Sequence, residues 1–207
     1  MKKWIFLSSI ILSSASFAVE PIVPIKDVTS AAPIKVKLGE RLFHDKLLSP
    51  DHTISCASCH DLKKGGTDQL PVSIGIKNQK GPINSPTVFN SRYNIKQFWD
   101  GRAKDLVEQA AGPVTNPKEM GSNWTYVIKT LKSDPKYVSL FKSSYGGEIN
   151  QATITQAIAE FEEIKQVNFV QKNNIRNEDG SLLFPLDVPD FNFRSALSIE
   201  KNLNNSN

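Results

Sequence analysis

The sequence predicts a mainly α-helical fold with long ordered loops. Three observations predict it. Several stretches place apolar residues at helical spacing, no stretch alternates apolar and polar residues as a half-buried strand does, and glycine and proline gather between the expected helices. The 207 residues are 39% hydrophobic and 22% charged, which excludes a disordered or collagen-like chain and suits one domain with additional segments.

The first eighteen residues are expected to be a secretory signal peptide. Lys2 and Lys3 give a basic start, residues 4–12 form an apolar run too short to span a bilayer stably, and small residues precede a cleavage position after Ala18. The alternative is an uncleaved anchor. Cleavage would place the mature chain in a bacterial periplasm with no membrane contact. Residues 19–33, which include three prolines, are expected to form a flexible arm.

The helices follow in chain order. A short amphipathic helix is expected over residues 36–43, then mostly ordered loop over residues 45–94, then a helix over residues 103–110 that ends at Gly112-Pro113. Residues 124–131 have the i, i+3, i+4, i+7 apolar pattern, with Ser122 or Asn123 as N-cap. Pro135 opens another helix, and Thr153 with Gln156 predicts a capping box before the last apolar stripe.

These elements define the expected domain organisation. Residues 34–163 are expected to form the folded domain. Residues 164–207 are rich in asparagine, lack a helical period and are expected to form a divergent, poorly ordered tail. The net charge is only +4, from 25 basic and 21 acidic residues, which argues against a nucleic-acid partner.

Both cysteines of the chain fall within one five-residue motif, Cys56-Ala57-Ser58-Cys59-His60. This is the attachment motif of c-type haem: two thiols three positions apart can each form a thioether with one haem, and the next residue supplies an imidazole for the iron. The alternatives are a disulfide or redox pair, which would need a βαβ context, and a zinc site. His44 and His52 are expected to be exposed polar residues rather than ligands.

Two hypotheses differ in what occupies the coordination position of the haem iron opposite the histidine. A haem that only carries electrons needs a sixth ligand, whereas one that does chemistry needs an open position. Met120 is the one methionine besides the initiator, and its thioether is a candidate sixth ligand. That ligand would make the chain an electron-transfer cytochrome. The alternative is that Met120 belongs to the core.

Further motifs lie in a fixed order around this one. They occupy residues 38–43 (Leu-Gly-Glu-Arg-Leu-Phe), 73–75 (Ser-Ile-Gly), 81–87 (Gly-Pro-Ile-Asn-Ser-Pro-Thr), 98–103 (Phe-Trp-Asp-Gly-Arg-Ala), 108–110 (Glu-Gln-Ala) and 112–120. With them, the sequence from about Leu38 to Glu162 resembles the N-terminal peroxidatic haem domain of bacterial di-haem cytochrome c peroxidases. The resemblance implies a cytochrome c-like haem domain with one covalently bound haem c.

The resemblance also implies roles for the haem-binding and catalytic residues. Cys56 and Cys59 would hold the haem and His60 would be the proximal iron ligand. Glu119 matches the distal acid–base residue of the family, and Gln109 matches its hydrogen-bonding partner. Such a pair suits peroxide cleavage, because a carboxylate can move a proton between the two oxygens while an amide orients the peroxide.

Three further residues match positions around this site. Trp99 and Phe98 match the aromatic pair beside the haem, with Trp99 on the electron route between haems. Asn84 matches a ligand of a calcium ion at the domain interface, although its other expected ligands belong to a domain that this sequence lacks.

The implied activity is reduction of hydrogen peroxide to water, with electrons from a small periplasmic donor such as a cytochrome c or a cupredoxin. The family forms dimers, so a dimer is the implied assembly. The alternatives are a mono-haem electron-transfer cytochrome and an inactive truncated peroxidase fragment.

Two positions depart from the family pattern. The chain has no second Cys-x-x-Cys-His motif for the second haem of the family. Ile76 stands where the family usually has a distal histidine, and an aliphatic side chain cannot bind iron. The sequence therefore predicts an open distal face and a high-spin ferric haem.

Overall fold

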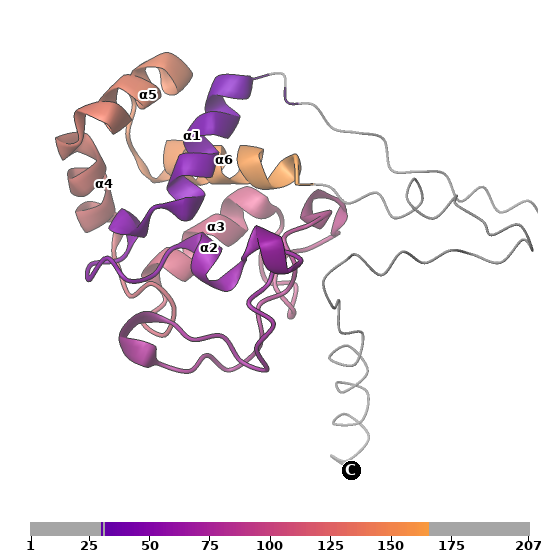
Figure 1. Ribbon diagram of the computed structural model, residues 1–207. Helices are drawn as coiled ribbons and strands as arrows, with labels where there is room; N and C mark the ends of the chain where they lie inside the picture. Colours follow the sequence, from indigo (N-terminus) through magenta and orange to yellow (C-terminus); the bar gives the residue numbers. More distant parts are fainter. Residues whose placement is uncertain (1–29, 31, 166–207) are drawn as a thin grey trace, which may run out of the picture.

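A computed structural model of the protein describes residue 30 and residues 32–165 (Figure 1). The predicted signal peptide, nearly all of the arm and nearly all of the tail lie outside the described residues. Within the described part of the chain, no helix is both long and apolar enough to cross a membrane.

The prediction of a mainly α-helical fold is confirmed. In residues 32–165 the only strand-like pairings are two isolated bridges, Ile74 with Lys80 and Gln97 with Ala103. The α-helices are α1 (Pro33–His44), α2 (Cys56–Cys59), α3 (Leu106–Thr115), α4 (Trp124–Ser133), α5 (Pro135–Tyr145) and α6 (Gln151–Glu163). The loops of this described segment contain short 3₁₀ turns: η1 (Lys46–Leu48), η2 (Leu62–Lys64), η3 (Ile76–Asn78) and η4 (Ser91–Tyr93).

Two helix starts follow the sequence signals. The Asn123 side chain accepts a hydrogen bond from the N–H of Tyr126 at 2.9 Å and caps α4, as predicted. Pro135 is the first residue of α5, where its missing N–H costs nothing, and Asp134 caps that helix through the N–H of Lys136.

The predicted bounds of α3 are wrong. The helix begins at Leu106 with Asp105 as its cap, because the carbonyl of Ala103 already pairs with the N–H of Gln97 at 2.8 Å. It then continues through Pro113 to Thr115. Pro113 lies in the last turn, so it removes only the hydrogen bond that would have reached the carbonyl of Gln109.

The predicted capping box of the last helix is also displaced. The Asn150 side chain accepts from the N–H of Thr153 at 3.0 Å, and the hydroxyl of Thr153 accepts from the N–H of Asn150 at 3.2 Å. Asn150 is therefore the N-cap and Thr153 the third helical residue. Asparagine caps a helix as well as threonine does, so residue type alone did not separate the two positions.

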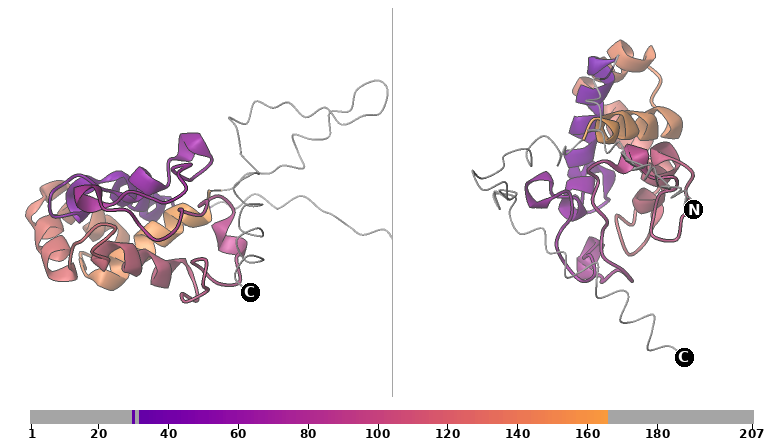
Figure 2. Two further views of the ribbon diagram at one scale, coloured as in Figure 1. Left: turned by 90° about the horizontal axis from the view of Figure 1, so that it is seen from below. Right: turned by 90° about the vertical axis from the view of Figure 1, so that its right-hand side faces the viewer.

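The core lies where α1 crosses α6, and α3 packs on the same helix α6 (Figure 1). Leu38, Leu42 and Phe43 of α1 are fully buried, and the Phe43 ring meets that of Phe161 of α6 at a centroid distance of 5.2 Å. Helices α4 and α5 pack together at one end of the molecule, and the long loops between α2 and α3 lie at the other (Figure 2).

Gly39 sets how closely α1 approaches α6. A Cβ at this position would overlap the carbonyl oxygen of Ala157 and lie 2.9 Å from the Cβ of Phe161. We expect Gly39→Ala to destabilise the haem-loaded protein by about 1–3 kcal/mol, measured by urea unfolding, because the helices must separate.

The direction of that change is informative. In an open helix, replacing glycine by alanine would stabilise by roughly 1 kcal/mol through helix propensity. Glu40→Ala, at an exposed position of the same helix, is the control and should change stability by about 0.5 kcal/mol or less. A Gly39→Ala variant as stable as the native protein would contradict the close packing of α1 on α6.

Candidate haem site

The predicted attachment motif forms α2, a single helical turn. The N–H of Ser55 donates to the hydroxyl of Ser58 at 2.9 Å, and the N–H of His60 donates to the carbonyl of Cys56 at 2.9 Å. Three residues make nearly one helical turn, so Cys56 and Cys59 lie on the same side of α2. Both are free thiols, and burial raises the pKa of each.

The main chain orients the imidazole of His60. Its Nδ1 lies 3.3 Å from the carbonyl oxygen of Gly66. A carbonyl only accepts, so Nδ1 carries the proton of this hydrogen bond and Nε2 keeps its lone pair for a metal. Burial lowers the pKa of His60, which favours the neutral imidazole that binds iron.

The loop that carries this acceptor is itself fixed. The N–H of Gly66 donates to the carbonyl of Asp61 at 2.9 Å, and the hydroxyl of Thr87 donates to the carbonyl of Gly65 at 2.6 Å. Gly66 has φ of +75° and a Cβ there would lie 2.9 Å from the hydroxyl oxygen of Thr87, so only glycine fits without strain.

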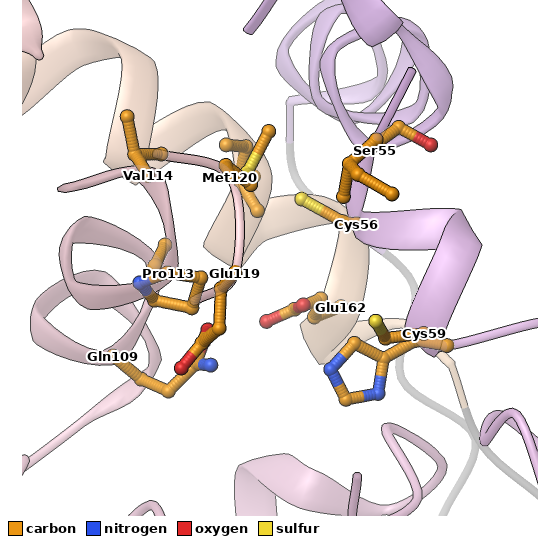
Figure 3. A pocket seen from close by; sticks show the side chains of 13 residues that line it. Ser55, Cys56, Cys59, Gln109, Pro113, Val114, Glu119, Met120 and Glu162 are labelled. Atoms are coloured by element: carbon orange, nitrogen blue, oxygen red, sulfur yellow. The ribbon is translucent and has the colours of Figure 1, made fainter. Parts of the chain in front are cut away.

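A cavity of about 460 Å³ opens beside α2 (Figure 3). The volume includes space that is open to solvent. Cys56, Cys59 and His60 line it together with Gln109 and Glu119. The apolar part of the lining comes from α3, α6 and two loops, and consists of Ile54, Ala110, Pro113, Val114, Met120 and Ile158.

Gln109 and Glu119 lie across the cavity from the two cysteines (Figure 3). Gln109 comes from α3, and Glu119 from the turn that follows it. Burial raises the pKa of Glu119, while a 2.7 Å hydrogen bond from the Asn116 amide and the charge of Arg102 act in the opposite direction. Asn116 was not predicted as a partner of Glu119 from the sequence. Its position three residues before Glu119, in a turn, was the signal that could have indicated this contact.

Ile76 supports the turn of Glu119 rather than lining the cavity. Its side chain is 3% exposed, and its N–H donates to the carbonyl of Glu119 at 2.7 Å. The preceding Gly75 allows this approach, since a Cβ there would overlap the carbonyl oxygen of Lys118. A Cβ at Gly121 would in turn lie 2.9 Å from Ile76 Cγ2.

Met120 is 2% exposed and lines the cavity. It therefore belongs to both the core and the candidate site. His44 and His52 are exposed, as predicted. The Nδ1 of His44 pairs with the carbonyl of Glu40, and the Nε2 of His52 pairs with the hydroxyl of Tyr126.

The predicted aromatic pair does not line the cavity. Trp99 is 52% exposed, and its Nε1–H donates to the carbonyl oxygen of Asn84 at 3.1 Å. Phe98 is half-buried with φ of +65°, and the Arg102 guanidinium lies 3.4 Å from its ring centroid. Their roles beside the haem and on an electron route stay predictions.

The calcium role of Asn84 also stays a prediction. The main-chain carbonyl oxygen of Asn84 accepts the hydrogen bond from Trp99, as described above. Across residues 32–165 no three His, Cys, Asp or Glu side chains come together as a metal site.

Sequence analysis missed Glu162. This α6 residue is 4% exposed, lines the cavity, and its Oε2 has no hydrogen-bond partner within the described structure. Burial raises its pKa to about 8. Glu162 stands four positions after Ile158 and next to Phe161, on the buried face of α6, and this spacing was the signal that could have found it.

The residues of the cavity fit a covalently attached haem. Its lining is mostly apolar, as the face of a porphyrin requires. The two free thiols and the neutral imidazole lie together at one side, where thioether formation and iron ligation need them. The unpartnered Glu162 oxygen also fits, because a buried acceptor without a protein partner is typical of a site that holds a further group or an ordered water.

Comparison with known proteins supports this assignment. The family model described as di-haem cytochrome c peroxidase matches residues 33–172. Cytochrome c551 peroxidase of Nitrosomonas europaea is 54% identical over 145 residues, covering 70% of this chain and 43% of the relative. Cytochrome c peroxidase Ccp of Escherichia coli K12 is 49% identical over 144 residues, covering 69% of this chain and 31% of the relative.

The fold is similar to solved structures as well. A MauG-like protein associated with microbial copper homeostasis is 31% identical with a TM-score of 0.62, over 70% of this chain and 43% of that one. The diheme peroxidase BthA from Burkholderia thailandensis is 23% identical, with a TM-score of 0.59 over 66% of this chain and 40% of that one, which shows a shared fold. The chain spans less than half the length of these relatives.

Proposed function

We propose that the protein carries one covalent haem c and reduces hydrogen peroxide to water in the bacterial periplasm, because the chain belongs to the di-haem cytochrome c peroxidase family. The observation that carries this proposal is the placement of Glu119 and Gln109 across one cavity from Cys56, Cys59 and His60. Because the chain covers only part of its relatives, the activity of the whole relatives is a proposal for this chain.

The attachment side of the site follows from the geometry of α2. The sulfurs of Cys56 and Cys59 would hold the haem, and the Nε2 of His60 would be the proximal iron ligand. The hydrogen bond from Nδ1 to Gly66 fixes the ring orientation and makes the imidazole a better donor to the iron.

The distal side moves a proton. When bound, the haem supplies an iron at which peroxide binds and is reduced. Glu119, as a carboxylate, would take the proton from the inner peroxide oxygen and return it to the outer one, which leaves as water. The Gln109 amide would donate a hydrogen bond to the oxygen on which negative charge develops. The hydrogen bond from Asn116 holds the carboxylate for this transfer.

The electrons would come from a small periplasmic redox protein such as a cytochrome c or a cupredoxin. Complete reduction of one peroxide consumes two electrons and two protons and gives two water molecules. A dimeric assembly and a calcium ion at Asn84 remain part of the proposal through family membership.

A second candidate function is electron transfer alone, and the placement of Met120 favours it. The thioether lies in the lining of the same cavity, where it could reach the iron. An inactive fragment is the third alternative, and it would retain the haem without either activity.

An absorption spectrum of the haem-loaded protein separates these functions. Because Ile76 offers no ligand, we expect a high-spin ferric haem as isolated, followed by a spectral change within seconds of adding one equivalent of peroxide. A low-spin spectrum with a methionine-to-iron charge-transfer band would identify the electron-transfer cytochrome instead. A high-spin haem that does not react with peroxide would identify the inactive fragment.

A further inference from the structure

Glu162 is a buried carboxyl group that the peroxidase chemistry described above does not use. It projects from the last full turn of α6 into the haem cavity, between Glu119 and Cys59 (Figure 3). Only 4% of the residue is exposed, and its Oε2 lacks a hydrogen-bond partner in the described structure. A buried acidic group without a partner is costly, so this one calls for a physical account.

Within residues 32–165, no counter-charge lowers the pKa of this carboxyl. Burial is the only influence that shifts its pKa, which it raises to about 8. The neutral and ionised forms of the carboxyl are therefore balanced near pH 8. A group in this position changes its proton occupancy when the charge beside it changes by one unit.

The charged and titratable groups around Glu162 are few. The faces that α1 and α3 turn to the core are apolar in the described chain, formed by Leu38, Gly39, Leu42 and Phe43 and by Leu106, Ala110 and Val114. The 3₁₀ turn η4 contributes buried Ser91. The titratable groups that share the cavity with Glu162 are Cys56, Cys59, His60 and Glu119.

Haem attachment removes most of these groups from titration. Both thiols become thioethers, and the free nitrogen of the imidazole becomes an iron ligand. Glu162 and Glu119 are then the two protein groups that can exchange a proton at the cavity wall. Of the two, Glu162 is the more deeply buried, and its Oε2 is a buried oxygen without a partner in the described structure, whereas Oε1 of Glu119 accepts from Asn116.

We propose that Glu162 couples reduction of the haem to uptake of one proton. When a one-electron donor converts the iron from ferric to ferrous, one positive charge is lost from the cavity. The carboxylate of Glu162 then takes one proton from the solvent and becomes a neutral carboxyl, and reoxidation releases that proton. Charge inside the apolar cavity is thereby kept constant, because one electron and one proton enter together.

The inference rests on the haem attachment of the proposed function and not on peroxide reduction. A protein that holds haem but fails to reduce peroxide can still show this coupling. The readout is therefore the midpoint potential, measured by spectroelectrochemical titration of the haem-loaded protein at a series of pH values.

We expect the native midpoint potential to fall as pH rises through the range around 8, by up to about 59 mV per pH unit for one proton per electron. In Glu162→Gln the amide stays neutral, so the potential should remain at the acid value of the native protein and lose this fall. Glu163→Gln, at the partly exposed neighbouring position, is the matched control and should keep the fall. A native potential that does not change with pH would overturn the proposal.

Glu119→Gln distinguishes the two carboxyls of the cavity. If the fall is lost in Glu119→Gln and kept in Glu162→Gln, the coupling belongs to Glu119 and the proposal is wrong. If the Glu162 variant takes up no haem, the coupling is tested on the native protein by measuring proton uptake during electrochemical reduction in weak buffer near pH 8. Proton uptake together with a new infrared band of a protonated carboxyl supports the proposal, and absence of either overturns it.

Discussion

Glu119→Gln is expected to slow the reaction of the haem-loaded protein with hydrogen peroxide by about 10² to 10⁴-fold, the usual contribution of general acid–base catalysis. Glutamine keeps the shape of the side chain but cannot take a proton from the inner peroxide oxygen. The measurement is the rate of the haem absorption change after rapid mixing with peroxide. Glu148→Gln makes the same chemical change at an exposed position and should leave the rate unchanged.

The pH dependence of the native rate gives a second readout of the same carboxyl. Glu119 acts as a base only when ionised, and burial raises its pKa above the ordinary value. The rate should therefore fall as pH is lowered through this raised pKa, and the fall should be absent in the slow Glu119→Gln variant. An unchanged rate in the variant, or the same pH profile in both proteins, would remove Glu119 from the mechanism.

The second large effect concerns haem attachment. The double variant Cys56→Ser, Cys59→Ser is expected to lose all covalently bound haem, because serine hydroxyls cannot replace thiols in thioether formation. The mass of the denatured chain measures this directly, since only a covalently bound haem remains with the polypeptide. Each single variant should retain haem through the remaining thiol.

Ser58→Ala is the control for this second experiment. It removes the hydroxyl that accepts from the N–H of Ser55 but leaves both thiols in place. Haem attached to this variant and lost from the double variant would assign attachment to the thiols rather than to the local turn. Haem that stays on the double variant after denaturation would contradict the assignment of the motif.

The sequence was sufficient where short-range chemistry determines the outcome. The Cys56–His60 motif, the Asn123 cap and the Pro135 start depend on residues next to one another, so spacing alone located them. Glu119 and Gln109 needed the resemblance to a family, because nothing local distinguishes them from exposed polar residues. The structure then places both in one cavity with the motif.

What the sequence did not provide depends on contacts between distant segments. The start of α3 is displaced because Ala103 pairs with Gln97 across a loop. The spacing of Glu162 from Ile158 indicates the buried face of α6, but the packing of α6 against α1 and α3 determines how deeply the carboxyl is buried. The exposed position of Trp99 likewise depends on the path of residues 84–102, which lack a periodic pattern.

The hydrogen-bond acceptor of His60 has a consequence for how this site can change by mutation. The carbonyls of Gly66 and Pro86 both act on the imidazole, and both belong to the main chain. Substitution of either residue leaves its carbonyl in place, so among the groups that act on the imidazole only the charge of Asp68 can be changed by a single side-chain substitution. The basicity of the imidazole therefore depends mainly on the path of the main chain through residues 66 and 86.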